Sequence, residues 1–173
     1  MYTKIITKSN IRFMWTHYTS VPLDKVLYAD QEDAMLSPLM KPIGIWLGLE
    51  DEWKSWCLEN ENSAFDMNDY YKYRVDFDAD SRIKTVTNFE ELTSFIDDYN
   101  YGYGYAIDWV ACSLSFDGIV FLGVTNMKKK FYAQGALDYQ KYMLLFSLHI
   151  SSVCIWNPRA IKKIVLAERH KTS

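Results

Sequence analysis

The stretch "YKYRVDF" at residues 71–77 is the clearest strand signal in the chain and indicates that the fold contains a β-sheet. Apolar positions alternate there with Lys72, Arg74 and Asp76, which is typical of a strand with one buried face. These apolar positions are Tyr71, Tyr73, Val75 and Phe77. The following segment "RIKTV" (82–86) is expected to extend or pair with this strand.

Further strands are expected on both sides of this segment. In "IRFMWTH" (11–17) the same period of two places Ile11, Phe13, Trp15 and His17 on one face. The uninterrupted apolar run "GIVFLGV" (118–124) predicts a strand buried on both faces. Near the end, "VCIW" (153–156) and "IKKIVLAE" (161–168) predict two strands around the turn "NPRA".

Helices are expected between these strands. In "NFEELTSFIDDY" (88–99), Asn88 is the expected N-cap, and Glu91 follows three residues later as in a capping box. "EDEWKSWCLENE" (50–61) predicts a short helix whose first-turn carboxylates are favoured by the helix dipole. Residues 136–146 predict a further helix.

Strands and helices do not alternate regularly, so the sequence predicts an α+β fold with a mostly antiparallel or mixed sheet. A chain of 173 residues, of which 49% are hydrophobic, is expected to form one folded domain over residues 1–173. The net charge of −3 disfavours general binding to the phosphate backbone of nucleic acids.

Three features of the sequence bear on the cellular location of the protein. No segment reaches the roughly 18 apolar residues that a membrane span needs, so no membrane association is expected. "MYTKIITKSN" lacks the apolar region of a secretory signal. The three cysteines form no CxxC pair, which is typical of reduced thiols. A cytoplasmic location, in the protein's own cell or in a host cell, is therefore expected.

Common catalytic motifs are missing. The sequence has no GxGxxG or GxxxxGK[ST] loop for phosphates, no HExxH or other histidine pair for a metal, and no GxSxG nucleophile turn. Classical dinucleotide-binding, P-loop and metal-dependent sites are accordingly disfavoured, and no metal site is expected.

Two short stretches have a composition suited to a ligand. "WTHYTS" (15–20) places His17 among hydroxyls at a strand end, where N–H and O–H groups suit a ribose or a carboxamide; the alternative is a structural histidine at a sheet edge. "KPIGIWLG" (41–48) combines Gly44 and Trp46, so a ligand could approach its backbone; the alternative is a core strand with a glycine bulge.

Two further stretches carry open alternatives. Lys128–Lys130 form the only basic run, which is either a solvated loop or a contact for an acidic partner or a pyrophosphate. "NYGYGYA" (100–106) predicts a loop that could recognise an acceptor or a partner surface.

Taken in order, "HYTS", "KPIGIWLG", "EWKSWC", "IDW…FDGIVF" and "SSVCIWN" resemble the motifs of a phage and bacterial group related to the ADP-ribosyltransferase superfamily. The resemblance covers roughly residues 15 to 157. It implies a split, curved pair of sheets with a few short helices around a cleft for NAD. It also implies transfer of ADP-ribose from NAD to a protein or nucleic-acid acceptor, by an effector acting against host defence.

The resemblance assigns roles to residues of this chain. His17 would bind the nicotinamide-side ribose with support from Thr19 or Ser20. The backbone from Gly44 to Trp46 would hold the carboxamide. The remaining cofactor-binding positions would be Trp53 or Trp56 over the nicotinamide face, and Ser152.

The last motif departs from the family pattern. His149 stands where relatives have an aspartate, and Gly48 stands where they often have serine. An imidazole does not stabilise the cation that develops on the ribose as a carboxylate does. A catalytic carboxylate would then lie elsewhere, with Asp108, Asp117 and Glu91 as candidates. The alternatives are an inactive relative that inhibits a protein partner, and an NAD glycohydrolase.

Overall fold

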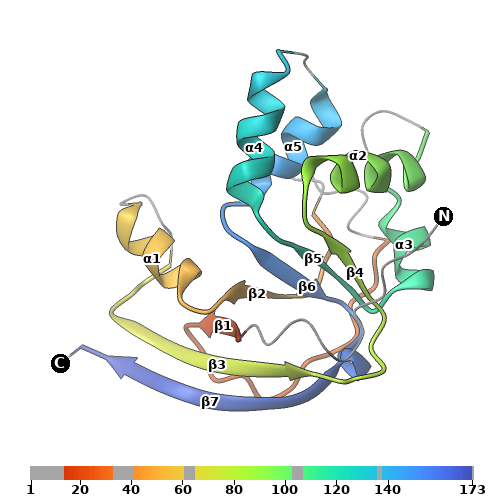
Figure 1. Cartoon of the computed structure of the whole chain (residues 1–173). Coiled ribbons are helices and arrows are strands. Elements are labelled where there is room, and N and C mark those ends of the chain that lie inside the picture. Colours follow the sequence, from red (N-terminus) through yellow and green to blue (C-terminus); the bar gives the residue numbers. More distant parts are fainter. Residues whose placement is uncertain (1–13, 33–40, 61–64, 103–106, 136–137, 173) are drawn as a thin grey trace.

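The computed structural model describes residues 14–32, 41–60, 65–102, 107–135 and 138–172, and its strands form one curved sheet (Figure 1). The strands are β1 (Trp15–Thr19), β2 (Ile45–Leu49), β3 (Asp69–Phe77), β4 (Ile83–Val86), β5 (Gly118–Phe121), β6 (Ser152–Ile155) and β7 (Ile161–Lys171). The α-helices are α1 (Glu52–Glu59), α2 (Phe89–Asp98), α3 (Trp109–Ser115), α4 (Val124–Ala133) and α5 (Tyr139–Ser147). The α+β prediction is confirmed.

The strands are hydrogen-bonded in the order β4-β5-β6-β2-β1-β3-β7. Only β4 and β5 are parallel; the other neighbouring pairs are antiparallel. The expected pairing of 82–86 with 71–77 is therefore wrong. Strand β4 forms one edge of the sheet, whereas β3 is next to β7, which forms the other edge. The described strands also form one continuous series, in contrast to the pair of sheets that the resemblance implies.

Both faces of the sheet are buried at β5. Ile119 and Phe121 belong to a core shared with helices α2 to α5, whereas Val120 belongs to a second core on the other face. Alternate residues of a strand point to opposite faces, so a strand with both faces buried needs apolar residues throughout. The apolar run that begins at Gly118 is explained in this way, and the prediction of a buried strand is confirmed.

The second core lies inside the curve of the sheet. Val75 of β3 and Ile164 of β7 contact the same cluster as Val120 of β5 and Val153 of β6. In Figure 1 the long strands β3 and β7 form the lower end of the sheet, and helices α2, α4 and α5 lie at its upper end. Strands β3 and β7 thus help to cover a core to which no described α-helix contributes a buried residue; the short 3-10 helix at Pro158–Ala160 contributes Ala160.

The alternation predicted for 71–77 is present in the C-terminal half of β3. Tyr73 and Val75 are buried, while Arg74 and Asp76 are exposed. Before Tyr73 the register with β7 shifts by an irregularity between Lys72 and Tyr73. The register of β3 with β1 has no shift from Tyr71 to Val75. Tyr70 therefore lies on the other face of β3, where it is buried in contact with the rings of Tyr18 and His170.

The helix starts follow capping rules with one difference from the prediction. The Asn88 side chain accepts a hydrogen bond from the Glu91 N–H at 2.9 Å, so the predicted N-cap of α2 is confirmed. The Glu91 carboxylate accepts from the backbone N–H and the hydroxyl of Thr87, both at 2.8 Å, instead of from Asn88. The helix predicted at 136–146 corresponds to α5, which Asp138 caps.

Two helices were not predicted. Lys128–Lys130 belong to α4, so their interpretation as a loop is wrong. The buried stripe of this helix consists of Val124, Met127 and Phe131, whose helical spacing is hidden by the lysines between them. Helix α3 begins at Trp109, where the resemblance implied only a strand.

The N-terminal strand is described from Trp15 onward, so Ile11 and Phe13 lie outside the described residues. The same holds for residues 103–106 of the tyrosine-glycine stretch. Cys57, Cys112 and Cys154 are buried and form no disulfide with one another. Burial raises the pKa of Cys112 to about 12, so this thiol stays protonated at neutral pH.

Candidate functional site

A cavity of about 290 Å³ lies where β1, β2, α1 and the α5–β6 connection meet. Five of the residues that the sequence singled out for a ligand site line this cavity. They are His17, Trp46, Trp53, His149 and Ser152. They come from four separate stretches of the chain, which the antiparallel pairing of β2 with both β1 and β6 brings together. We refer to this hollow below as the cavity.

His17 is held by the neighbouring strand. Its Nδ1 lies 2.9 Å from the carbonyl oxygen of Trp46, and because a carbonyl only accepts, Nδ1 carries the proton. Burial lowers the pKa of His17, and the hydrogen bond to Trp46 only partly opposes this effect. The ring is therefore neutral at neutral pH, with Nε2 left as an acceptor. His17 thus offers an acceptor to a ligand, in place of the N–H donor expected from the sequence.

Stacked aromatic rings form the wall on the side of α1. The Trp53 and Trp56 rings stack with centroids 5.1 Å apart, and the Trp56 ring stacks on His149 at 4.3 Å. The spacing of three residues on a helix places both tryptophans on one side of α1. Trp53 lines the cavity, whereas Trp56 lies behind it and supports the imidazole of His149.

His149 lies in the connection between α5 and β6, next to the buried Leu148. Burial lowers the pKa of His149, and the positive charges of Lys41 and Lys128 lower it further. The imidazole is accordingly neutral at neutral pH. It occupies the wall of the cavity as a flat ring, held by Trp56, and it supplies no negative charge.

Three predicted cofactor-binding residues, Thr19, Ser20 and Gly44, do not line the cavity. The Thr19 hydroxyl accepts from the Val21 N–H at 3.2 Å in the turn after β1, and Ser20 is exposed. Gly44 lies so close to β6 that a Cβ there would meet the carbonyl oxygen of Ile155. The hydroxyl of Thr19 and the missing side chain of Gly44 therefore have structural explanations.

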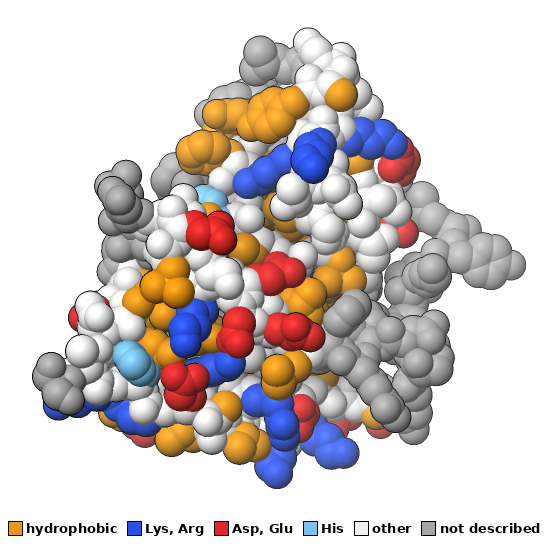
Figure 2. Space-filling view, turned by 60° about the vertical axis from the view of Figure 1, so that its left-hand side comes forward, with side chains coloured by type: hydrophobic (Ala, Val, Ile, Leu, Met, Phe, Trp, Pro, Cys, Tyr) orange, Lys and Arg blue, Asp and Glu red, His pale blue; other side chains and the backbone are white. Residues whose placement is uncertain are grey.

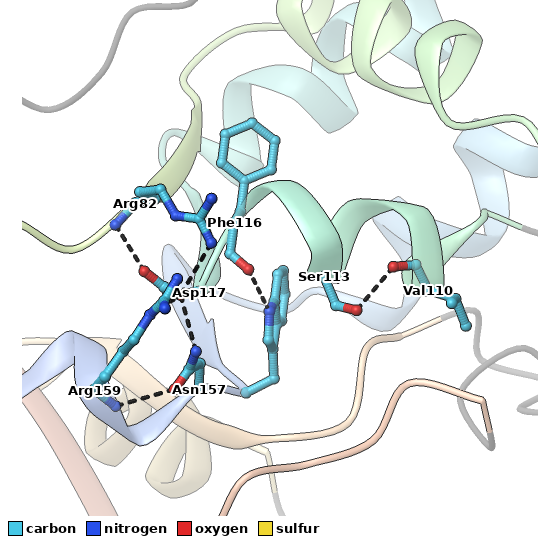
Figure 3. A network of polar contacts seen from close by, with 8 residues as sticks. Arg82, Val110, Ser113, Phe116, Asp117, Asn157 and Arg159 are labelled. Carbon is cyan, nitrogen blue, oxygen red and sulfur yellow. Dashed lines mark hydrogen bonds and ion pairs between the residues drawn. The ribbon is translucent and has the colours of Figure 1, made fainter.

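The candidate catalytic carboxylates also lie away from the cavity. Asp117 is buried at the start of β5, where its side chain accepts from the Arg82 N–H at 3.0 Å, the Asn157 amide at 3.1 Å and Arg159 Nε at 2.7 Å (Figure 3). Its own carbonyl accepts from the N–H groups of Trp156 and Asn157. Asp117 therefore joins the β4, β5 and η2 (Pro158–Ala160) segments.

Asp108 and Glu91 have structural contacts of the same kind. The Asp108 side chain accepts from the Ala111 N–H at 2.8 Å and caps α3. Glu91 bonds to Thr87 at the start of α2. Among the residues that the structure describes, no carboxylate lines the cavity.

A second hollow of about 580 Å³ adjoins the cavity. His149 and Ile150 line both hollows, and four carboxylates line the second one. These carboxylates are Glu50, Asp51, Glu52 and Glu59. We call this hollow the acidic groove. Figure 2 shows acidic side chains gathered across the middle of this face of the molecule.

Glu52 lines the acidic groove next to the cavity and was not singled out in the sequence as a candidate for the site. Its carboxylate accepts from the Ser151 N–H at 3.0 Å, next to the cavity-lining Ser152. Burial raises the pKa of Glu52 above its ordinary value, although the hydrogen bonds to Ser151 oppose the shift. In the sequence, Glu52 was interpreted only as a first-turn residue of a helix. Its position directly before Trp53 was the available signal.

The negative charge of Asp51 is balanced by a neighbouring lysine. Its carboxylate accepts from the Tyr18 hydroxyl at 2.5 Å and forms an ion pair with Lys72 at 2.5 Å. These two contacts lower the pKa of Asp51. Because Tyr18 lines the cavity and Asp51 lines the acidic groove, this contact fixes the start of α1 between the two hollows.

No group of three or more histidine, cysteine, aspartate or glutamate side chains able to hold a metal ion occurs among the described residues. None of the described helices combines the length and hydropathy needed to cross a membrane. Comparisons with protein-family models, with curated proteins and with solved structures gave no match.

Proposed function

We propose that the protein is an ADP-ribosyltransferase-like enzyme that binds NAD in the cavity and transfers ADP-ribose to a protein or nucleic-acid acceptor. The observation that carries this proposal is the convergence of His17, Trp46, Trp53, His149 and Ser152 on one cavity. The motif resemblance alone points to all five of these residues. A host protein is a suitable acceptor for an effector of the phage and bacterial group that the motifs resemble.

The dimensions suit one part of NAD. Small-molecule sites span about 300 to 1,000 Å³. The cavity, at about 290 Å³, is at the lower end of this range and matches the nicotinamide ring with its ribose. The adenosine part would then extend into the acidic groove, because His149 and Ile150 line both hollows. Trp53 offers its ring to the nicotinamide face, and Nε2 of His17 offers an acceptor to a ribose hydroxyl or to the carboxamide N–H.

The reaction requires the bond between the ribose C1′ and the nicotinamide nitrogen to break. Its electron pair leaves with nicotinamide, which becomes neutral, and positive charge develops on the ribose. The acceptor then forms a bond to C1′ and loses a proton. A carboxylate lowers the energy of this developing cation. We assign this role to Glu52, a half-buried carboxylate that lines the adjoining acidic groove and accepts from the Ser151 N–H. The assignment requires the ribose C1′ to lie at the boundary where His149 and Ile150 line both hollows.

A second candidate function is binding of NAD or a related nucleotide without turnover, by a relative that acts on a protein partner. The absence of a carboxylate from the described lining of the cavity favours this candidate. Hydrolysis of NAD, with water as the acceptor, requires the same residues as transfer and differs from it only in the product.

We expect replacement of His17 with alanine to weaken NAD binding at least tenfold, which corresponds to about 1.4 kcal/mol. The reason is the loss of the Nε2 acceptor and of the hydrogen bond that fixes Trp46. Isothermal titration with NAD measures the change, and a thermal melt checks that the variant is folded. The control is Thr19→Ala on the same strand, which is expected to bind NAD within about twofold of the parent protein. Equal affinity of His17→Ala and the parent protein would show that the cavity is not the NAD site.

Replacement of Glu52 with glutamine separates the two candidate functions. If Glu52 stabilises the cation, we expect the rate of nicotinamide release to fall about 100-fold or more, with NAD affinity nearly unchanged. Nicotinamide release and the mass of added ADP-ribose are measured together, and the exposed Glu59→Gln on the same helix is the control. A parent protein that binds NAD but releases no nicotinamide supports the second candidate. Undiminished release by Glu52→Gln rejects the catalytic role of Glu52.

A further inference from the structure

The three lysines of α4 have different surroundings. Lys130 forms an ion pair with Glu90 of α2, and Lys129 is exposed. Lys128 is half-buried, and its charge is close enough to act on both Lys41 and His149. Figure 2 shows basic side chains gathered over α4 in the upper part of this face, above the acidic side chains. Lys128 is therefore the half-buried lysine of the run, and its charge acts on the cavity-lining residues Lys41 and His149.

Lys41 brings a second positive charge to the same place. It lines the cavity, and its ammonium nitrogen lies 4.9 Å from the centre of the Trp46 ring. Neither Lys41 nor Lys128 forms an ion pair with a carboxylate in the part of the chain that the structure describes. The carboxylates of the acidic groove belong to the α1 side, where Asp51 is paired with Lys72.

Two neighbouring ammonium groups without a counter-ion are unfavourable when partly buried, because burial penalises charge and like charges repel. Burial lowers the pKa of Lys41 and of Lys128 accordingly. An anion placed between them removes both penalties. The neutral His149 beside them can donate a hydrogen bond to the same anion from a ring N–H.

We propose that Lys41, Lys128 and His149 form a subsite that binds the phosphate of a nucleotide whose ring occupies the cavity. The proposal rests on the proposed function, because the phosphate is reached from a ligand seated beside Trp46 and Trp53. The subsite makes the site selective for phosphorylated nucleotides over nucleosides. It also gives a role to two lysines in a protein with net charge −3, one that lines the cavity and one that is half-buried on α4.

The test compares nicotinamide mononucleotide with nicotinamide riboside, which differ by one phosphate. By isothermal titration, the parent protein is expected to bind the mononucleotide at least tenfold more tightly. Lys128→Gln and Lys41→Gln are expected to remove this preference. The preference is measured as the ratio of the two affinities, because Lys41 also lies over the Trp46 ring and its replacement changes riboside binding as well. The matched control is Lys129→Gln, on the same helix but exposed, which is expected to keep the preference. A full preference in both Lys128→Gln and Lys41→Gln overturns the proposal.

Inorganic pyrophosphate separates failure of the subsite from failure of the proposed function. If pyrophosphate raises the melting temperature of the parent protein but not of Lys128→Gln, the subsite stands even when no nicotinamide compound binds. If nicotinamide compounds bind equally well to the parent protein and all three variants, the ring site stands and the phosphate subsite is rejected. An equal loss of pyrophosphate binding in Lys129→Gln indicates general surface attraction and also overturns the subsite.

Discussion

Replacing Asp117 with alanine is expected to lower the free energy of unfolding by about 3 kcal/mol. The carboxylate is buried and accepts hydrogen bonds from the Arg82 N–H and the Asn157 amide, so its loss leaves these donors without their partner. The two guanidinium groups contribute less, because the Arg82 and Arg159 side chains are 48% and 58% exposed and their ion pairs are screened by water.

Urea unfolding followed by circular dichroism measures this change, which corresponds to a melting temperature lower by about 6 to 12 °C. The matched variant is Asp108→Ala, which removes only the N-cap of α3 and is expected to cost about 1 kcal/mol. Both aspartates were candidates for catalysis, so NAD turnover per folded molecule is measured on the same samples. Equal stability losses in the two variants would contradict the structural role described for Asp117.

Replacing Gly44 with alanine is expected to cost about 2 to 3 kcal/mol. A Cβ at this position would meet the carbonyl oxygen of Ile155 and would lie 2.9 Å from the Cys154 sulfur. The first contact is with backbone, so relief requires β2 and β6 to separate where Ile45 is paired with Ile155. The loss is measured by chemical denaturation.

Gly48→Ala is the control for this variant, because it lies at the other end of β2. Its Cβ would lie 2.9 Å from Ile150 Cδ1, the end of a flexible side chain that can rotate away, and 3.2 Å from Trp53 Cβ, which has to move by only a few tenths of an ångström. We expect a stability loss of about 1 kcal/mol or less there. Gly48 also lines the cavity, so this variant is expected to weaken ligand binding more than it weakens the fold. A Gly44→Ala protein as stable as Gly48→Ala would show that the two strands tolerate a wider spacing.

The fold class could be predicted because several segments show a clear pattern of apolar residues. The alternation around Val75 and the apolar run from Gly118 each indicate burial on one or two faces. The order of the strands in the sheet was harder to predict, because the pattern within a strand does not show which other strands are its neighbours. The parallel partner of β4 is reached only through α2 and α3, so the short distance between 71–77 and 82–86 was misleading.

Only part of the candidate site could be predicted from the sequence. His17, Trp46 and His149 were singled out by composition or by motif, and the structure places them in one cavity. Glu52 was missed because a carboxylate in the first turn of a helix has an ordinary explanation. Asp117 was a candidate because the reaction needs a carboxylate and His149 does not supply one, but acidity alone does not distinguish a catalytic group from a buried acceptor of hydrogen bonds.

The order of strands in the sheet bears on how the chain folds during synthesis. Strand β2 is bordered by β6, so Ile45 meets its partner Ile155 only after more than a hundred further residues have been made, and β3 must wait for β7 in the same way. Pairings between such distant segments have a high loop-closure cost and form slowly. A ribosome-bound fragment that ends before β6 would therefore leave the centre of the sheet open, and completion of the ligand cavity has to follow the emergence of β6.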